Sequence, residues 1–339
     1  MSQQAYDFDV TVLATYLEKN IEGFEGPLTA KKFEGGQSNP TFLIATKKQN
    51  YVLRRKPPGK LLKSAHAVDR EFRVMSALAD TNVPVAKMYH LCEDDSVIGS
   101  MFYVMEFIDG TVRWDPALPE ISNEERSAIY SEMNRVLAAL HSVDITSVGL
   151  DNYGKPGNYF ERQISRWSSQ YRSAETETIE SMETLYQWLP QNMPEDDGRV
   201  SLVHGDFRLD NMMFSHDRAN VLALVDWELS TLGHPFADLA YQCMQLRMEK
   251  DGMMPGLAGV DRTSLGIPSE EAYVAEYCER MGLNSIPNWN FYLAFSFFRF
   301  ASILQGVKKR ALNGNASNEK ALSVGNFVKP LADLAVSLL

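Results

Sequence analysis

Two apolar runs that each break into acidic residues place the strongest constraint on this chain. The first reads "LVHGDFRLDN" over residues 202–211, and the second reads "LVDWE" over residues 224–228. The six residues "SHDRAN" at 215–220 have the composition of a turn, so the two runs are predicted to form a β-ribbon. Such a ribbon would bring Asp226 back beside Asn211. Two carboxylates at neighbouring strand ends repel each other unless a cation or a protein donor lies between them.

The first run carries a pattern that phosphoryl-transfer sites use. Asp206 and Asn211 are five residues apart in the arrangement H-x-D-x-x-x-x-N. In kinase catalytic loops of this pattern, the Asp receives the proton of an attacking hydroxyl and the Asn offers a carbonyl oxygen to a metal. Asp226 would supply the charged metal ligand. Magnesium favours a few protein oxygens together with substrate phosphates, so we expect Asp206 as base and Asn211 and Asp226 as ligands of Mg²⁺.

Size and composition narrow the classes of partner. The chain has 339 residues, which favours two domains, and a formal net charge of −11, which disfavours nucleic acid and anionic membranes as partners. Three distant cysteines without a CxxC pair, and an N-terminus without a basic start or a long apolar run, favour a reduced cytoplasmic setting. The apolar stretch "FYLAFSFFRFASIL" is too short to span a membrane, so we predict a buried helix there.

The order of predicted elements divides the chain near residue 109. Before it, five short β-type runs and one helical pattern over residues 64–80 predict a small sheet with one helix. After it, a capping box of Ser122 and Glu125 opens a helix, and helices dominate apart from the ribbon. We therefore expect an α+β protein with a β-rich nucleotide-binding part at 1–108 and a mainly helical catalytic and substrate-binding part at 109–339.

These motifs resemble those of a known family. "HGDFRLDN" with "VDWE" resembles the aminoglycoside phosphotransferase family, which shares the bilobed protein-kinase-like fold. "LRRKPPGKLLKSAHAVDREFRV" resembles the kinase-like domain attached to some acyl-CoA dehydrogenases. The resemblance covers nearly the whole chain, with four modest motifs in the correct order. It implies an enzyme that uses ATP and Mg²⁺ to phosphorylate a hydroxyl group of a small molecule.

The resemblance extends to a glycine-rich loop, "EGGQSNPTF", between two predicted strands. Gly35 and Gly36 would let backbone amides approach the phosphates of the nucleotide closely, and Ser38 belongs to the same loop. A Gly-Gly hairpin without any ligand is the alternative interpretation of this stretch.

An arginine stands where protein kinases carry the phosphate-binding lysine. In "YVLRR", Arg54 occupies the position of the V-A-I-K lysine, and Glu71 of "DREFRV" is its expected helix partner. Arginine binds phosphate as a planar fork rather than as a point charge. Arg55 or Lys56 takes the role instead if the register is off by one, and a plain surface ion pair is the alternative for Arg54 and Glu71.

The remaining expected site residues also come from the resemblance. "VMEFI" is similar to a kinase hinge, with Met105 beside the adenine and the backbones of Glu106 and Ile108 bonding its edge. Arg208 lies two residues after the expected base, where protein kinases carry a phosphate-contacting lysine. Asp238, in "HPFADLA", corresponds to a family Asp that braces the catalytic loop.

Two other functions and several acceptors stay open from the sequence. A catalytically inactive nucleotide-binding module would have no reason to keep Asp206, Asn211 and Asp226 together, and a metal-dependent hydrolase would need more convergent histidines. The acceptor is a hydroxyacyl compound or its CoA thioester, or else an aminoglycoside, choline, homoserine or a sugar, and GTP could replace ATP. Four acids suggest a cationic aminoglycoside or simply a solvated helix face: Glu175, Glu177, Glu180 and Glu183.

Overall fold

The structure is a computed structural model that describes residues 8–33, 39–57, 67–250, 254–313 and 321–339. The chain divides into two compact units, one of residues 1–111 with 222–229 and the other of residues 112–221 with 230–339. The boundary expected at 108/109 lies near the end of the first range. The segment 222–229, which the sequence analysis assigned to the C-terminal part, clusters with the first unit.

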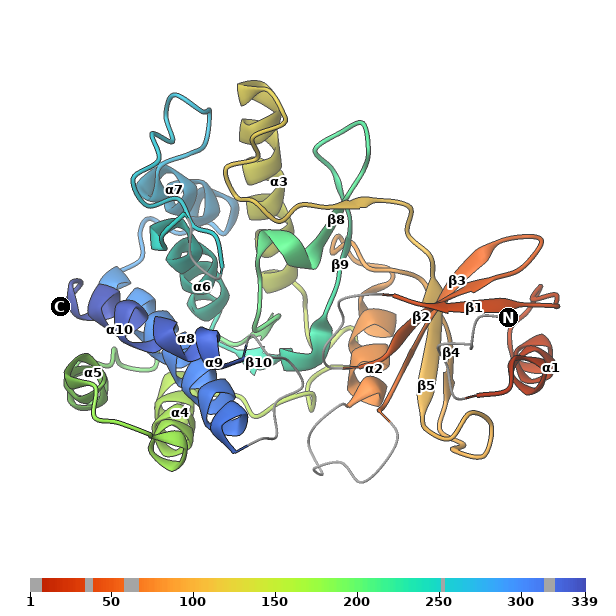
Figure 1. Cartoon of the computed structure of the whole chain (residues 1–339). Helices are drawn as coiled ribbons and strands as arrows, with labels where there is room; N and C mark the ends of the chain where they lie inside the picture. Colours follow the sequence, from red (N-terminus) through yellow and green to blue (C-terminus); the bar gives the residue numbers. More distant parts are fainter. Residues whose placement is uncertain (1–7, 34–38, 58–66, 251–253, 314–320) are drawn as a thin grey trace. The chain divides into compact units, whose positions relative to one another are not determined.

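The first unit is built on one antiparallel sheet (Figure 1, red to orange). Its strands follow the order β1-β2-β3-β5-β4 and have the bounds Thr29–Lys32, Thr41–Ala45, Asn50–Arg55, Phe102–Glu106 and Met88–Cys92. Side chains alternate between the two faces of a strand, so Phe102 and Val104 of β5 join one hydrophobic core while Tyr103 points to the other face. Each of the five predicted β-type runs contains one strand of this sheet, so all five predictions are confirmed.

This unit contains two described helices, α1 (Val10–Asn20) and α2 (Val68–Leu78), so the expectation of a single helix is wrong. Asp9 caps α1 by accepting a hydrogen bond from the amide of Thr11 at 2.7 Å. Leu13 and Leu17, one turn apart, are buried in the same hydrophobic core as Phe42 and Ile44 of β2. The aspartate cap and the two leucines four residues apart are local sequence signals of a helix, so α1 was predictable from the sequence.

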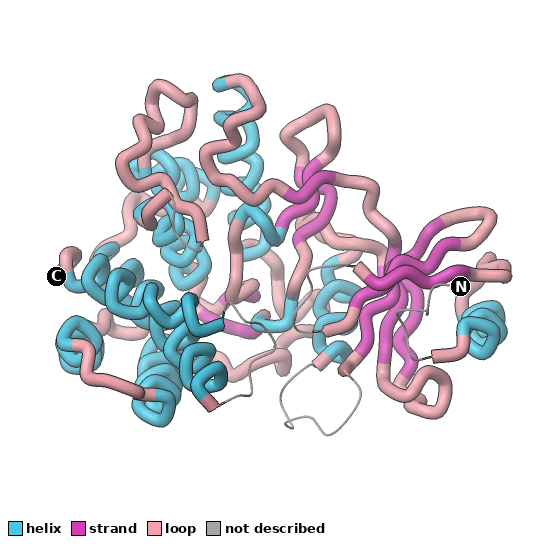
Figure 2. Tube along the Cα trace, viewed as in Figure 1, coloured by secondary structure: helices cyan, strands magenta, loops and turns pink. Residues whose placement is uncertain are grey.

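The second unit is mainly helical, as Figure 2 shows in cyan. The capping box of Ser122 and Glu125 is present, because each residue's side chain accepts a hydrogen bond from the backbone amide of the other. The helices α3 to α10 have the bounds Asn123–His141, Tyr159–Ala174, Glu180–Gln191, Phe236–Arg247, Glu270–Arg280, Trp289–Leu312, Ala321–Val324 and Val328–Val336.

The helix α8 confirms the prediction of a buried helix over the most apolar stretch of the sequence. Residues from Phe291 to Gln305 along it are largely buried, including Arg299 and Gln305. It packs against α4, α6 and α10, so it forms the centre of the second unit. No helix in the described part of the chain is long and apolar enough to span a membrane.

Short strands flank the loop of residues 204–211. β7 (Ser201–Val203) pairs antiparallel with β10 (Thr231–Gly233), a strand that the sequence analysis did not predict. β6 is Thr111–Val112, and the predicted ribbon strands are β8 (Met212–Phe214) and β9 (Val221–Leu224). The amide of Ser215 donates to the carbonyl of Asn220 at 2.9 Å, which closes the predicted turn.

Candidate active site

The loop after β7 is fixed through its backbone. Gly205 has a φ of +83°, in the left-handed region that favours glycine. The carboxylate of Asp238, from the first turn of α6, accepts hydrogen bonds from the amides of His204 at 2.6 Å and Gly205 at 2.9 Å. His204 is fully buried, and its Nδ1 faces the amide of Asp206 at 3.3 Å. The brace expected from Asp238 is confirmed, and His204 is a packed loop residue.

Asp238 keeps its charge in a buried position. Burial by itself would raise the pKa of Asp238, but the neighbouring His141 and the hydrogen bond from the Gly205 amide lower it below the usual value. His141 lies 3.5 Å from Asp238 through Nε2, and its Nδ1 lies 2.7 Å from the hydroxyl of Tyr277. A charged acceptor is a stronger partner for backbone amides than a neutral one, so this network holds the loop firmly.

Asn211 holds Asp206 in one orientation. Its Nδ2 donates both to the backbone carbonyl of Asp206 at 2.8 Å and to Oδ2 of the Asp206 side chain at 2.9 Å. A 3₁₀ turn over Leu209–Asn211 brings the two residues together. Because the amide nitrogen is committed to Asp206, the amide oxygen of Asn211 is the side-chain atom left to coordinate a metal.

Arg208 lies on the same loop and is partly neutralised there. Its guanidinium forms an ion pair with Asp210 and lies 3.8 Å from the carboxylate of Asp206. Burial raises the pKa of Asp210, and the Arg208 charge opposes that rise. The carboxylate of Asp210 therefore orients Arg208 beside the expected base.

Two buried side chains that the sequence analysis did not assign to the site also contact this loop. Arg299 of α8 donates from Nη2 to the carbonyl of Gly205 at 2.6 Å. Tyr241 of α6 is buried, which raises the pKa of its phenol, and the charge of Asp206 and a hydrogen bond to it act in the same direction. Neither residue belongs to a local motif, because each reaches the loop from a helix distant in the sequence.

In the first unit, Arg54 and Glu71 form the expected ion pair, with Nε 2.9 Å from Oε2. Tyr103 donates to Oε2 of Glu71, and Asn39 donates to Oε1, each at 2.9 Å. Burial raises the pKa of Glu71, whereas the Arg54 charge and the Tyr103 hydroxyl oppose that rise. Such donors stabilise a buried carboxylate, so Arg54 and Glu71 form a buried, hydrogen-bonded ion pair rather than a surface ion pair.

The neighbouring cations are committed elsewhere, which decides the register of "YVLRRK". Arg55 points to the opposite face of the sheet, where it is 3% exposed and donates to the carbonyl of Ile98 at 3.0 Å. The Nζ of Lys56 lies 3.5 Å from Asp69. Of the three cations that the sequence left open, the structure therefore pairs Arg54 with Glu71.

Arg54 also neutralises Asp226 within the first unit. Its Nη2 lies 2.8 Å from Oδ1 of Asp226 and 4.0 Å from Glu228. Although burial opposes its charge, Glu71, Tyr103 and Asp226 raise the pKa of Arg54. Asp226 has a φ of +66°, an uncommon backbone conformation for a residue other than glycine, and one that often marks functional positions. The Asp226 carboxylate thus has a protein cation and does not depend on a metal for neutralisation.

The other residues expected to contact the nucleotide lie partly outside the described ranges. Gly35, Gly36 and Ser38 lie outside the described residues. Met105 and Glu106 end β5, and they are half-buried, as is Ile108. The amide of Glu106 donates to the carbonyl of Lys87 at 2.8 Å, so this amide is already engaged within the protein.

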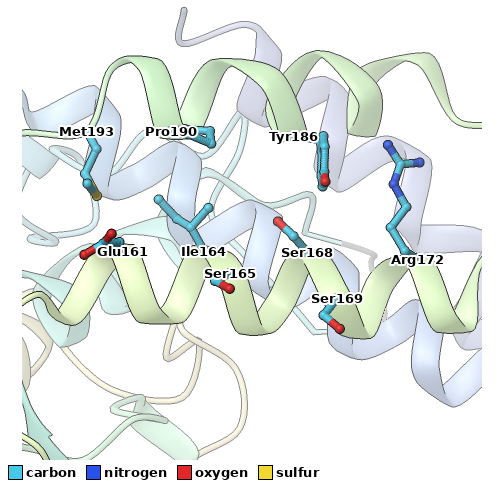
Figure 3. A pocket seen from close by; sticks show the side chains of 9 residues that line it. All are labelled: Glu161, Ile164, Ser165, Ser168, Ser169, Arg172, Tyr186, Pro190 and Met193. Carbon is cyan, nitrogen blue, oxygen red and sulfur yellow. The ribbon is translucent and has the colours of Figure 1, made fainter.

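The acidic cluster near α5 is paired with basic side chains. A cavity of about 410 Å³ lies between α4 and α5, with Arg172 and Tyr186 at one end (Figure 3). Arg172 binds both Glu175 and Glu183, and Lys308 binds Glu177 at 2.5 Å. Most of the negative charge that would attract a cationic ligand is therefore neutralised within the protein.

The metal ligands expected from the sequence fall in different units, Asn211 in the second and Asp226 in the first. Their joint binding of Mg²⁺ stays a prediction. Within the described ranges, no group of three or more His, Cys, Asp and Glu side chains is placed to hold a metal ion.

The braced H-x-D loop and the Arg–Glu pair are features of a kinase-like phosphotransferase, and comparison with known proteins agrees. The model of the phosphotransferase enzyme family, the aminoglycoside phosphotransferase family, matches residues 29–277. The chain belongs to this family and has its bilobed α+β kinase-like fold.

Similar proteins include an acyl-CoA dehydrogenase family member and proteins described as aminoglycoside phosphotransferases. Acyl-CoA dehydrogenase family member 10 of Mus musculus is 50% identical over 94% of this chain, which spans only 30% of that relative's length. A solved structure from Ralstonia eutropha JMP134, described as a candidate aminoglycoside phosphotransferase, is 52% identical with a TM-score of 0.91, and 98% of each chain is covered. The aminoglycoside phosphotransferase APH(4)-Ia, in complex with AMP-PNP and hygromycin B, shares the fold with a TM-score of 0.64 at 14% identity, over 97% of this chain and 98% of that one.

Proposed function

We propose that this protein transfers the γ-phosphoryl group of ATP to a hydroxyl group of a small molecule, with Mg²⁺ as cofactor. The observation that carries the proposal is the contact of Asn211 with both the backbone and the carboxylate of Asp206. This contact holds a carboxylate ready to accept a proton and leaves an amide oxygen for a metal. A structural neighbour in complex with AMP-PNP supports a nucleoside triphosphate as donor.

In this proposal the side chains of the second unit do the proton chemistry. The acceptor hydroxyl donates its proton to the carboxylate of Asp206 as the bond from its oxygen to the γ-phosphorus forms and the bond to the β-phosphate oxygen breaks. Arg208 orients the transferred group from the same loop. Phosphoryl transfer depends mainly on positioning and charge neutralisation, so a rigid loop serves it well.

The remaining residues would position the nucleotide. Bound Mg²⁺ would supply positive charge that neutralises the charge developing on the phosphate oxygens. Asn211 and Asp226 would be its protein ligands, while Arg54, fixed by Glu71, would bind the phosphates. The loop with Gly35, Gly36 and Ser38 would cover the phosphates, and Met105, Glu106 and Ile108 would contact the adenine.

For the acceptor we propose a hydroxyacyl compound or its CoA thioester. Support comes from the half-identical acyl-CoA dehydrogenase family member and from the pairing of Glu175, Glu177 and Glu183 with basic side chains. A cationic aminoglycoside is the second candidate, favoured by the similarity to the Ralstonia relative, which is described as a candidate aminoglycoside phosphotransferase. Choline, homoserine and sugars complete the set to be tested.

The test is release of ADP from MgATP in the presence of a panel of alcohols. The panel contains hydroxy fatty acids, their CoA thioesters, aminoglycosides, choline, homoserine and sugars, and GTP is compared with ATP. We expect acceptor-dependent ADP release with a hydroxyacyl compound and its loss in Asp206→Asn. Asp217→Asn, in the exposed β8–β9 turn, is the matched control and should keep full activity.

An inactive nucleotide-binding protein is the alternative that this experiment also addresses. Such a protein would bind MgATP, detected by thermal stabilisation, without releasing ADP with any alcohol or with water. Hydrolysis of a phosphorylated compound in the absence of nucleotide would instead point to a hydrolase. Either outcome would contradict the proposed transferase activity.

A further inference from the structure

A buried arginine that contacts the loop of Asp206 lies outside the sequence motifs that contain the expected site residues. Arg299 lies on α8, is 6% exposed, and donates from Nη2 to the carbonyl of Gly205 at 2.6 Å. Gly205 is the residue immediately before Asp206, so the cation holds the peptide group that leads directly into the expected base. The contact joins residues that are far apart in the sequence but lie in the same compact unit.

Arg299 is held by aromatic rings rather than by an acid. Its guanidinium carbon lies 5.7 Å from the ring centre of Trp167 on α4 and 5.3 Å from that of Tyr241 on α6. No carboxylate in the described part of the chain forms an ion pair with it. A buried cation is costly to keep, and a packed apolar side chain would serve a purely structural helix at least as well. The position therefore requires an explanation beyond packing.

The loop is clamped on opposite sides of its backbone. The carboxylate of Asp238 accepts hydrogen bonds from the amides of His204 and Gly205, while the guanidinium of Arg299 donates one to the carbonyl of Gly205. The left-handed φ of Gly205 turns the chain at this point. With both sides of the turn fixed, the direction in which the Asp206 side chain leaves the backbone is fixed as well.

Tyr241 links the same arginine to the carboxylate itself. One face of its ring contacts Arg299, and its phenol lies near enough to Asp206 for that carboxylate to raise the pKa of Tyr241. Arg299 thus acts on Asp206 by two routes, through the preceding peptide group and through the tyrosine.

We propose that Arg299 is a positioning residue for Asp206, and that Tyr241 carries part of its effect to the carboxylate. This inference rests on the proposed function, in which Asp206 accepts the proton of the acceptor hydroxyl. A positioning role changes the rate of the chemical step and leaves the binding of the nucleotide largely intact, because neither residue is among those expected to bind the nucleotide.

The test compares Arg299→Met with Arg166→Met. Arg166 contacts the same Trp167 ring, at 5.4 Å, but it is exposed and, within the described ranges, forms no hydrogen bond or ion pair with the loop, so it controls for loss of a cation on that ring. Release of ADP from MgATP is measured with the alcohol that gives the fastest release in the panel, or with water alone. We expect Arg299→Met to lower kcat on the order of 10- to 100-fold, as small misplacements of catalytic groups do, with KM for MgATP little changed. Arg166→Met should leave both constants unchanged.

A double-mutant cycle separates positioning from a general structural role. Adding Arg299→Met to Asp206→Asn should cause no further loss of kcat, because the group being positioned is already gone. Arg299→Lys should recover part of the rate, since a lysine can still donate to the Gly205 carbonyl. Multiplicative losses in the double mutant, or a raised KM at unchanged kcat, would overturn the inference.

Two results keep this inference distinct from the proposed function. Full turnover in Asp206→Asn would reject the proposed function itself, whereas an inactive Asp206→Asn with normal kcat in Arg299→Met would reject only the role of Arg299. If Arg299→Met shows no cooperative melting, Tyr241→Phe decides, because it keeps the ring that contacts Arg299 and removes only the hydroxyl whose pKa Asp206 raises. An unchanged kcat in Tyr241→Phe would then overturn the proposal.

Discussion

At the scale of single residues, each expected catalytic acid has a protein donor of its own. The carboxylate of Asp206 accepts from Asn211, and that of Asp226 is paired with Arg54. The sequence showed acids with few neutralising bases nearby, because Arg54 is 172 positions away from Asp226. The residues are therefore held in place before any ligand binds, as efficient phosphoryl transfer requires.

The base can be tested by a substitution that keeps its shape. Asp206→Asn should lower kcat by at least ~10²-fold while the binding of nucleotide changes little, which is the usual range for loss of a general base. Single-turnover ADP release measures the effect, and the shift in melting temperature with MgATP reports the binding. Near-normal turnover would remove Asp206 from the mechanism.

Arg54 in the first unit should contribute to the binding of the nucleotide. Arg54→Ala removes the partner of both Glu71 and Asp226, so we expect weaker binding of MgATP or slower transfer. Titration of MgATP followed by intrinsic fluorescence measures the affinity. Lys56→Ala is the neighbouring control and should bind as the wild type does. Equal weakening in both variants would show a nonspecific effect of positive charge.

At the scale of elements, two helices fix the loop that holds the expected base. α6 supplies Asp238 and Tyr241, and α8 supplies Arg299, so the backbone of one short loop is held from two helices. The start of α6 is itself fixed by His234, whose Nε2 lies 3.2 Å from Asp197 and whose Nδ1 faces the amide of Phe236 at 3.3 Å.

His234 should make the stability of this corner depend on pH. Burial lowers the pKa of His234 in the folded protein below 6.5, although Asp197 opposes this. Between the lowered pKa and about 6.5, the unfolded chain binds a proton that the folded chain does not, so the free energy of unfolding falls as pH falls. Above that window the stabilisation is fully present.

We therefore expect His234→Gln to flatten the pH dependence of the free energy of unfolding from about pH 6.5 downward. Urea denaturation at a series of pH values measures this. Some dependence should remain, because burial also lowers the pKa of His90. An identical pH profile in His234→Gln and wild type would show that the imidazole of His234 titrates equally in both states.

At the scale of the whole molecule, the expected ligands of magnesium belong to different compact units. A metal–nucleotide complex that binds residues of both should stabilise the entire chain in one step. Mg²⁺ alone lacks the phosphate oxygens that would complete its coordination, and ATP alone leaves its own charge unneutralised.

MgATP should accordingly raise the melting temperature more than ATP with a chelator or Mg²⁺ alone, with a stabilisation that follows the logarithm of ligand concentration over its dissociation constant. Asp226→Ala should abolish the magnesium-dependent part, and Asn211→Ala should weaken it less, because a neutral carbonyl is the poorer ligand for a hard dication. Differential scanning fluorimetry gives the comparison. An unchanged magnesium response in Asp226→Ala would place the metal elsewhere.

The sequence by itself indicated most of the elements and the local motif, although not α1 or β10. Alternation and capping signals predicted the five strands and α3, and the H-x-D-x-x-x-x-N spacing singled out Asp206 and Asn211, which the structure joins by two hydrogen bonds within one short loop. The pairing of Arg54 with Glu71 also followed from the resemblance to a known family.

Tertiary structure alone decided which distant side chains complete these local features. It chose Arg54 over Arg55, because successive side chains of β3 point to opposite faces of the sheet, and a shift of one position exchanges those faces. It also brought Arg299 and Tyr241 to the catalytic loop. Helix packing sets such contacts, and no spacing along the chain encodes which residue of a buried helix will meet a given loop.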